Sequence, residues 1–293
     1  MKKHIYTILI ILFSAIFLVS AGFLAKYFIE SAKQRNQYDE LSQLVQQHRP
    51  SVSPSNSTDP TGSDNNTEPS DSTKPTGDGK TESNPVEQPS HVMVTHPETG
   101  ESIRILTEYA PIFERNSDLV GWIKIDGTEI DYPVLQTPKD PNYYLYRDFY
   151  KKNSSHGAIY ANERATIADP SSDNITLYGH KMRDGSMFSA LYDYMDRRFC
   201  EEHTLITFDT LTEHHTYQVV AVFRTTADDK GFAYHHFING NEDSFTQFIA
   251  QCKSLSVHNT GISAFYGDKL LTLSTCDLSV DNGRLVVVAK RIS

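Results

Sequence analysis

A long apolar run near the N-terminus, with Thr7, Ser14, Ser20 and Gly22 as its mild interruptions, constrains this chain more than any other feature. The run extends from Ile5 to Ala25 and follows two lysines, Lys2 and Lys3. About 20 apolar residues are enough to cross a bilayer as a helix, and lysines placed before such a run favour a cytoplasmic N-terminus. We therefore expect residues 1–28 to form a transmembrane anchor with a short cytoplasmic tail, and the rest of the chain to lie outside the cell.

A cleaved signal peptide is the alternative interpretation of the same run, because Val19-Ser20-Ala21 resembles a cleavage site. The apolar core of a signal peptide has only about 7–15 residues. The run in this chain is longer, so we favour an uncleaved anchor.

Two polar segments follow the apolar run and differ in composition. Residues 29–49 carry helix-tolerant side chains and stop before Pro50, which predicts a short juxtamembrane helix. Residues 50–95 consist largely of Pro, Ser, Thr, Asn, Asp and Gly. Such a segment cannot bury enough apolar surface to offset the entropy lost on ordering. We expect a disordered linker at 50–95 and one folded domain at 96–293.

The negative charge of the chain is concentrated in the linker. The formal net charge is -10, and residues 50–90 hold seven acidic side chains against two lysines, a net -5. The remainder is only mildly acidic, which argues against a nucleic acid as the partner.

Short β-like runs dominate the sequence after residue 95. They are rich in β-branched and aromatic residues and are separated by turn signals. The runs are Val120–Ile125, Ile159–Tyr160, Ile175–Tyr178, Leu205–Phe208, Tyr217–Phe223, Leu270–Leu273 and Leu285–Ala289. Helical patterns are expected at Ile103–Asn116, Met187–Arg197 and Glu242–Leu255. The pattern predicts a single mainly-β domain, a barrel or a sandwich, with peripheral helices.

One predicted strand ends in a cysteine. Alternate side chains of a strand share a face, so Cys276 lies on the same, more polar face as Thr272 and Ser274, opposite Leu271 and Leu273. A lone thiol is more often a buried structural residue than a nucleophile. The position of Cys276 alone therefore does not establish catalysis.

A histidine and an arginine occupy comparable positions at the ends of other predicted strands. His180 follows the run Ile175–Tyr178 after Gly179, a residue that permits close approach of the backbone. Arg284 opens the last strand after the turn at 281–283. Taken singly, each is more typical of a solvated or hydrogen-bonded surface residue.

Taken together, these residues resemble the active-site motifs of the sortase family. Thr272-Leu273-Ser274-Thr275-Cys276 resembles the motif T-L-x-T-C, Leu177–His180 resembles the histidine motif, and Arg284 resembles the family's arginine. The resemblance covers residues 105–293. It implies a sortase-type closed β-barrel of about eight strands with peripheral helices.

Two further segments are similar to class B sortases in particular. They are Val120–Gln136, with the tyrosines that follow it, and the helical pattern before the cysteine strand at 242–255. The resemblance implies a cysteine transpeptidase that cleaves a sorting signal of the N-P-x-T-N/G or P-x-T-G type after its threonine. The acyl group would pass from the surface protein to an amine of the cell-wall precursor lipid II. It also implies the membrane of a Gram-positive bacterium, with the catalytic domain outside.

The resemblance gives each of the three site residues a role. Cys276 would be the nucleophile, His180 would carry the proton, and Arg284 would hold the substrate carbonyl. A free thiol has a pKa near 8.5, and a neighbouring cation favours the reactive thiolate. Arginine keeps its charge and offers a fork of donors.

Candidate substrate contacts are fewer and rest on looser similarity. Ser274 and Thr275 lie beside the thiol in sequence, and Leu145 and Tyr234 are carried over from local similarity. Where some class B members have an asparagine before Tyr-Leu, this chain has Pro141-Asn142. We expect no cofactor and no metal, because no clustered set of carboxylates is evident.

Three alternatives to wall anchoring remain open from the sequence. The first is a pilin-polymerising sortase, and the second is a cysteine hydrolase that uses the same residues with water as acceptor. The third is a binding or scaffolding module on the same fold, which the presence of all three catalytic residue types disfavours.

Other candidate features are given structural interpretations. Adjacent strand residues face opposite ways, so the pairs 214–215 and 235–236 of histidine are expected in loops or on the surface rather than on a metal. Cys200 and Cys252 are expected to be buried thiols rather than a disulfide. Asp277 should point away from Cys276, which argues against a Cys-His-Asp triad.

Overall fold

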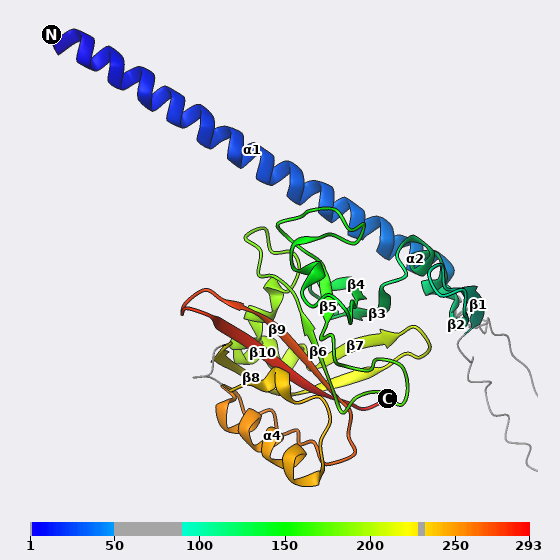
Figure 1. The fold of residues 1–293 in the computed structure, drawn as a ribbon. Coiled ribbons are helices and arrows are strands. Elements are labelled where there is room, and N and C mark those ends of the chain that lie inside the picture. Colours follow the sequence, from blue (N-terminus) through cyan, green and yellow to red (C-terminus); the bar gives the residue numbers. More distant parts are fainter. Residues whose placement is uncertain (1, 50–89, 228–231) are drawn as a thin grey trace, which may run out of the picture.

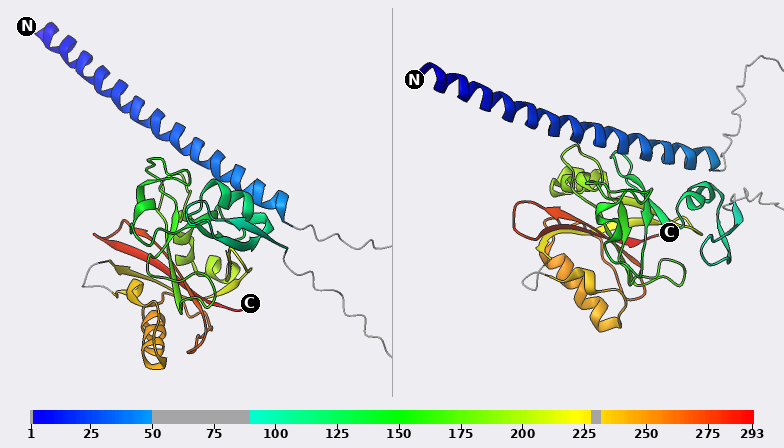
Figure 2. Two further views of the ribbon diagram at one scale, coloured as in Figure 1. Left: turned by 45° about the vertical axis from the view of Figure 1, so that its right-hand side comes forward. Right: turned by 45° about the horizontal axis from the view of Figure 1, so that its top comes forward.

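The structure, a computed structural model, describes residues 2–49, 90–227 and 232–293 of the chain. Its first element is one continuous helix, α1 (Lys2–His48). The N-terminal half of α1 projects away from the rest of the molecule, and the C-terminal half lies along it (Figures 1 and 2). The predicted anchor and juxtamembrane helix are thus parts of one element. The predicted linker falls outside the described residues as far as residue 89.

Eight strands close into a barrel in the order β10-β8-β7-β3-β4-β5-β6-β9. This confirms the predicted fold class. The strands are β3 (Leu119–Lys124), β4 (Asp131–Leu135), β5 (Ile159–Ala161), β6 (Asn174–Tyr178), β7 (Leu205–Thr210), β8 (Thr216–Thr226), β9 (Leu270–Asp277) and β10 (Gly283–Arg291).

Strand β4 was not among the predicted strands, because Pro133 interrupts its sequence. Proline cannot donate to a ladder, yet Pro133 lies opposite Trp122 in the antiparallel pair of β3 and β4. On its other side β4 pairs with β5 in parallel from Val134 onward. Pro133 therefore lies before the residues that pair with β5, and it belongs to only one of the two ladders of β4.

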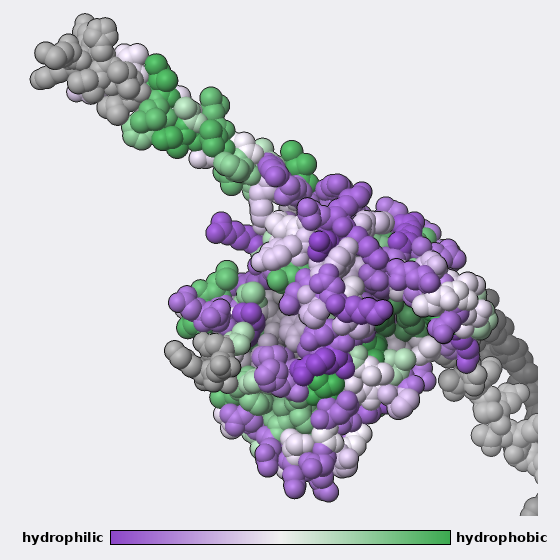
Figure 3. Space-filling view, viewed as in Figure 1, coloured by the Kyte–Doolittle hydropathy of each residue, from purple (hydrophilic) through white to green (hydrophobic). Residues whose placement is uncertain are grey.

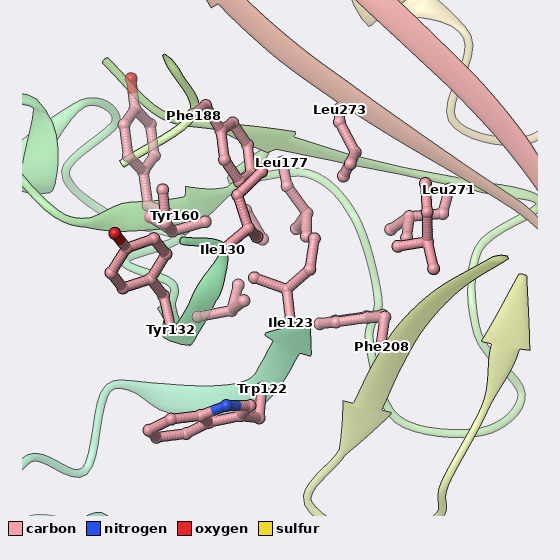
Figure 4. Close-up of a cluster of buried hydrophobic side chains, with 14 of the residues drawn as sticks. Trp122, Ile123, Ile130, Tyr132, Tyr160, Leu177, Phe188, Phe208, Leu271 and Leu273 are labelled. Atoms are coloured by element: carbon pink, nitrogen blue, oxygen red, sulfur yellow. The ribbon is translucent and has the colours of Figure 1, made fainter. Parts of the chain in front are cut away.

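The barrel interior is filled by alternate side chains of the strands, as the β pattern predicts. Ile123, Leu177, Phe208, Leu271 and Leu273 are fully buried in one cluster (Figure 4). Burying a side chain of this size contributes roughly 1.5–3 kcal/mol. This interior fixes the register of β6 and β9, since a slip by one residue would turn the leucines outward.

Helix α4 (Glu242–Leu255) covers the outer face of the barrel. Its buried residues Phe245, Phe248, Ile249 and Cys252 pack with Val286 and other residues of the β8–β10 face in a second cluster. The amphipathic helix predicted at 242–255 is therefore confirmed with its bounds. Asn241 caps its first turn by accepting a hydrogen bond from the Ser244 backbone N–H at 3.0 Å.

The segment between the linker and the barrel differs from prediction. A hairpin of β1 (His91–Thr95) and β2 (Ser102–Leu106) occupies residues assigned to the linker and to the start of a helix. Helical structure begins only at η1 (Thr107–Tyr109) and α2 (Ala110–Arg115). Within β2, Ile103 and Ile105 alternate with Ser102 and Arg104, and the strand is paired along its whole length with β1.

The remaining helices are short and lie in the connections. They are η2 (Tyr143–Tyr146), η3 (Ser189–Met195), α3 (Arg197–Glu202) and η4 (Tyr234–His236). The helical pattern expected at 187–197 is a 3-10 helix followed directly by α3.

The two halves of α1 have different surroundings. In the N-terminal half apolar side chains such as Phe17 and Phe23 are exposed, and this part is long and apolar enough to cross a membrane (Figure 3). In the C-terminal half Tyr38, Leu41 and Val45 are buried against the domain. We call residues 27–49 the docked segment.

Candidate active site

Backbone register brings the ends of β6 and β9 side by side. The two strands run parallel, with Tyr178 opposite Ser274, and the Gly179 N–H donates to the Ser274 carbonyl at 3.2 Å. His180 and Cys276 each lie two residues beyond that pair. Parallel strands keep their register past the last bond, so the imidazole and the thiol leave the same edge of the sheet.

Strand β10 adds the arginine from the other side of β9. It pairs antiparallel with β9, and Arg284 lies directly opposite Cys276. His180 therefore meets Cys276 and Arg284, which follow it by 96 and 104 positions in sequence, at one end of the barrel. All three residues line one pocket of about 520 Å³.

A short hydrogen bond orients the imidazole of His180. Its Nε2 lies 2.6 Å from the Leu145 carbonyl oxygen. A carbonyl oxygen can only accept, so Nε2 carries a hydrogen and donates. In the neutral ring the hydrogen-free atom is then Nδ1, which is left for proton exchange. The ring also contacts Tyr146, with the centroids 5.8 Å apart.

The guanidinium of Arg284 is oriented by its own turn. Its Nη1 donates to the Gly283 carbonyl at 2.8 Å and to the Asn282 carbonyl at 3.4 Å. Within the described residues, the remaining guanidinium donors make no hydrogen bond to the protein. A half-buried fork with free donors is suited to a carbonyl oxygen on which negative charge develops.

Two arginines, Arg164 and Arg284, line the pocket together with one carboxylate, Glu163. Burial lowers the pKa of His235, and its neighbours His236, Arg164 and Arg284 lower it further. His235 is therefore neutral at pH 7, while the two arginines keep their charge. A cationic surrounding favours a thiolate and an oxyanion over their neutral forms.

The candidate substrate contacts all lie on the pocket wall. Leu145, Tyr234, Ser274 and Thr275 line it. The Tyr234 and Ser274 hydroxyl oxygens are 2.6 Å apart, so one of them donates to the other. Thr275 is buried, like Ser274, and also lines the pocket.

Several lining residues escaped the sequence analysis. Tyr160 and Tyr178 form one wall, with ring centroids 5.3 Å apart, and Asn162 donates to the Tyr178 hydroxyl at 3.1 Å. Burial raises the pKa of both phenols, so they stay protonated. Tyr178 stands two residues before His180, and that proximity was the one signal available for it.

Asp277 takes no part in the pocket. It lies buried on the far face of β9, accepts a hydrogen bond from the Tyr192 hydroxyl, and pairs with Arg224 at 3.2 Å. Burial alone would raise its pKa, but the bonds from Tyr192 and Ser279 and the charge of Arg224 hold that pKa below the usual value. The expectation that Asp277 points away from Cys276 is confirmed.

The other cysteines are buried free thiols, as expected. Cys200 and Cys252 are unpaired and buried, whereas Cys276 is half-buried. Burial raises the pKa of both Cys200 and Cys252. They are therefore poor nucleophiles, and Cys276 is the half-buried thiol that lines the pocket.

The histidine pairs lie in different surroundings. His214 is exposed at the edge of an ion-pair cluster, His215 is buried, and His235 and His236 line the rim of the pocket. His215 packs edge-on against Tyr217, but it lies in the loop between β7 and β8, in line with the expectation of loop or surface positions. Across the described part of the chain, no three His, Cys, Asp or Glu side chains are grouped to hold a metal ion.

Comparison with known proteins identifies similar chains. The Sortase domain family model matches residues 123–292. Sortase B of Staphylococcus aureus is 37% identical over 179 residues, which cover 60% of this chain and 71% of that protein. Sortase B of Listeria monocytogenes is 34% identical over 197 residues, covering 67% and 78%. The solved complex of Staphylococcus aureus sortase B with a substrate superposes with a TM-score of 0.59 at 34% identity, covering 64% of this chain and 86% of that one.

Proposed function

Because the chain belongs to the sortase family of cysteine transpeptidases, and to its class B, we propose that Cys276, His180 and Arg284 carry out its acyl transfer. The observation that carries this proposal is the register of β6, β9 and β10. Tyr178 pairs with Ser274 and Cys276 pairs with Arg284, so the ends of these three strands supply the three functional groups to one pocket.

In the first step the Cys276 thiol gives its proton to His180 Nδ1, and the resulting thiolate attacks the carbonyl carbon of the threonine in the sorting signal. The carbonyl oxygen takes the negative charge, and the guanidinium of Arg284 binds it. His180 then donates the proton on Nδ1 to the leaving nitrogen as the peptide bond breaks. The products are a thioester on Cys276 and the released C-terminal remnant of the signal.

In the second step an amine resolves the thioester. The amine gives a proton to His180 Nδ1 as its nitrogen attacks the thioester carbon. The oxyanion again lies against Arg284, and the sulfur leaves as a thiolate. The bond to the Leu145 carbonyl keeps Nε2 protonated throughout, so one ring nitrogen carries every proton transfer.

The partners follow from the family and from α1. We assign a surface protein with a signal of the N-P-x-T-N/G or P-x-T-G type as acyl donor, and the amine of a lipid-linked cell-wall precursor as acceptor. The exposed apolar half of α1 is the membrane anchor, with the N-terminus in the cytoplasm and the barrel outside a Gram-positive cell. Ser274, Tyr234, Leu145 and Thr275 are the proposed substrate contacts.

A peptide assay with and without an amine tests the reaction type. The full chain in detergent micelles is incubated with N-P-x-T-N and P-x-T-G peptides, and products are identified by mass. We expect cleavage after threonine and a product that carries the added amine, such as triglycine. Cleavage that never incorporates the amine would instead identify a cysteine hydrolase.

A further inference from the structure

The docked segment of α1 buries two polar side chains against loops of the catalytic domain. Ser31 and Gln34 are 8% and 6% exposed, and with Tyr38, Leu41 and Val45 they form a stripe at helical spacing. Buried polar groups that lack partners cost free energy, so the partners of Ser31 and Gln34 indicate what this part of α1 does. Those partners lie in two loops, the one at 154–157 that precedes β5 and the one at 184 that follows His180.

Gln34 binds the loop that precedes β5. Its Nε2 donates to the Gly157 carbonyl at 2.8 Å, and the Tyr38 hydroxyl donates to the same oxygen at 3.4 Å. The Ser154 hydroxyl donates to Gln34 Oε1 at 2.6 Å. Both ends of the Gln34 amide are thus used, and they hold the backbone of residues 154–157 in a fixed position against the helix.

Gly157 packs against the carbonyl that orients His180. It has a φ of 60°, and a Cβ atom placed on it would lie 2.5 Å from the Leu145 oxygen and 2.7 Å from the Tyr144 oxygen. The next residue, Ala158, donates from its N–H to the Tyr144 carbonyl at 3.0 Å. The position of Gly157 therefore sets the position of the Leu145 carbonyl, which accepts from His180 Nε2 at 2.6 Å.

Ser31 binds the loop that follows His180. Its hydroxyl donates to Asp184 Oδ2 and lies 3.1 Å from His156 Nε2, while Arg35 donates to the Asp184 carbonyl at 3.3 Å. One face of α1 therefore contacts two segments next to the imidazole. Gln34 binds Gly157, which packs on the Leu145 carbonyl, and Ser31 binds the loop that follows His180.

We propose that the docked segment of α1 is part of the active-site framework, with Gln34 as a positioning residue that fixes the tautomer and orientation of His180 through Gly157 and Leu145. This inference rests on the proposed role of His180. It assigns α1 a second role beside anchoring, because the helix that crosses the membrane also completes the support of the imidazole.

The test compares two glutamines of the same helix in the full chain, in micelles. Gln34→Ala removes the bonds to Gly157 and Ser154. Gln43→Ala changes an exposed side chain of the same helix, about two and a half turns further along. We expect Gln34→Ala to lower kcat by about ten- to a hundredfold, as misplaced catalytic groups do, with KM near wild type and a modest fall in melting temperature, since buried partners are left without their bonds. The pH profile of kcat should also move, because Nε2 loses its fixed acceptor. Gln43→Ala should match the wild type in each respect.

His180→Ala, assayed in parallel, separates this inference from the proposed function. Loss of activity in His180→Ala together with equal kcat values for Gln34→Ala and Gln43→Ala would overturn the positioning role alone. Full activity of His180→Ala would overturn the proposed function. If Gln34→Ala does not fold, Ser154→Ala removes the bond to Gln34 Oε1 from the loop side. It should then show the same fall in kcat at unchanged KM, and wild-type kcat in that variant would contradict the proposal.

Discussion

Two regions of the molecule converge on His180, and they hold it by different means. On one side the strands β6, β9 and β10 bring Cys276 and Arg284 beside it through backbone register. On the other side the docked segment of α1 reaches it through side-chain bonds to the loops at 154–157 and 184. Many backbone hydrogen bonds fix the strand register together, so a single substitution changes it little. Each side-chain bond of α1, by contrast, can be removed by one substitution. The strand side should therefore decide whether the chemistry occurs, and the helix side how fast.

The largest expected effect is on the strand side, at the thiol. Cys276→Ala should lower peptide cleavage by at least about 10³-fold, because the acyl-enzyme of the proposed mechanism forms on its sulfur. The melting temperature should stay near wild type, since Cys276 is only half-buried. Cys252→Ala is the matched control: it should melt at a lower temperature because it opens a cavity beneath α4, and should keep kcat. Full cleavage by Cys276→Ala would remove the thiol from the mechanism.

Arg284 should give the next largest effect. Arg284→Lys keeps the charge but loses the planar fork, so kcat should fall by about 10²–10³-fold, as when an oxyanion donor is removed. Arg198→Lys, on the exposed surface of α3, should leave activity unchanged. Steady-state kinetics with a saturating sorting peptide measure both. Equal turnover in the two variants would show that charge alone is enough at position 284.

Gly157 connects the two regions and should give an intermediate effect. In Gly157→Ala the new Cβ would press on the Leu145 carbonyl, so kcat should fall by about 10²-fold along with some stability. Gly261→Ala imposes the same kind of backbone strain, at a φ of 73°, in open space. It should lose stability without losing kcat. A variant pair with equal kcat would break the proposed path from α1 to His180.

The smallest expected effect concerns the far end of the docked segment. Arg49 and His214 both pair there with the buried carboxylates of Glu108 and Asp209, and Tyr109 donates to Asp209 at 2.6 Å. Hydrogen bonds to Asp209 and Glu108 raise the pKa of His214 to about 9. Because the folded pKa is raised, the stabilisation is complete below the unfolded value near 6.5 and is lost as the pH rises through about 9.

This predicts a modest pH dependence of stability. The melting temperature of the wild type should fall by a few degrees relative to His214→Gln between about pH 6 and pH 10, a small change because His214 is partly exposed. Parallel thermal scans in micelles measure it. Parallel curves for the two proteins over this range would show that His214 does not stabilise the docking of α1.

The contrast between the two regions also explains what the sequence predicted. The alternation from Leu271 to Cys276 specifies which side chains face the barrel, so the ends of β6, β9 and β10 could be assigned from period-two patterning and turn signals. Strand β4 was not predicted, because a proline such as Pro133 argues against a strand unless the ladder that lacks its N–H is known. The hairpin at 91–106 depends on pairing between its own two strands, and the sequence of either strand alone does not indicate its partner.

The docking of α1 could not be recognised in the same way. Its buried positions follow the spacing of a helix face, but the first two are Ser31 and Gln34, so only three apolar residues mark the stripe. A polar residue at such a position is typical of a solvent-facing surface until its partner is known. The partners, Gly157 and Asp184, lie more than a hundred residues away, and only the folded chain brings them to the helix.

The central claim is that Cys276 carries the acyl group between donor and acceptor. The most direct measurement is intact-mass and peptide-map analysis of the full chain, quenched in acid after mixing with an N-P-x-T-N peptide. The account predicts an adduct of the fragment that ends in threonine on Cys276, which disappears when triglycine is added as the transfer product forms. No adduct in the wild type, or the same adduct in Cys276→Ala, would contradict it.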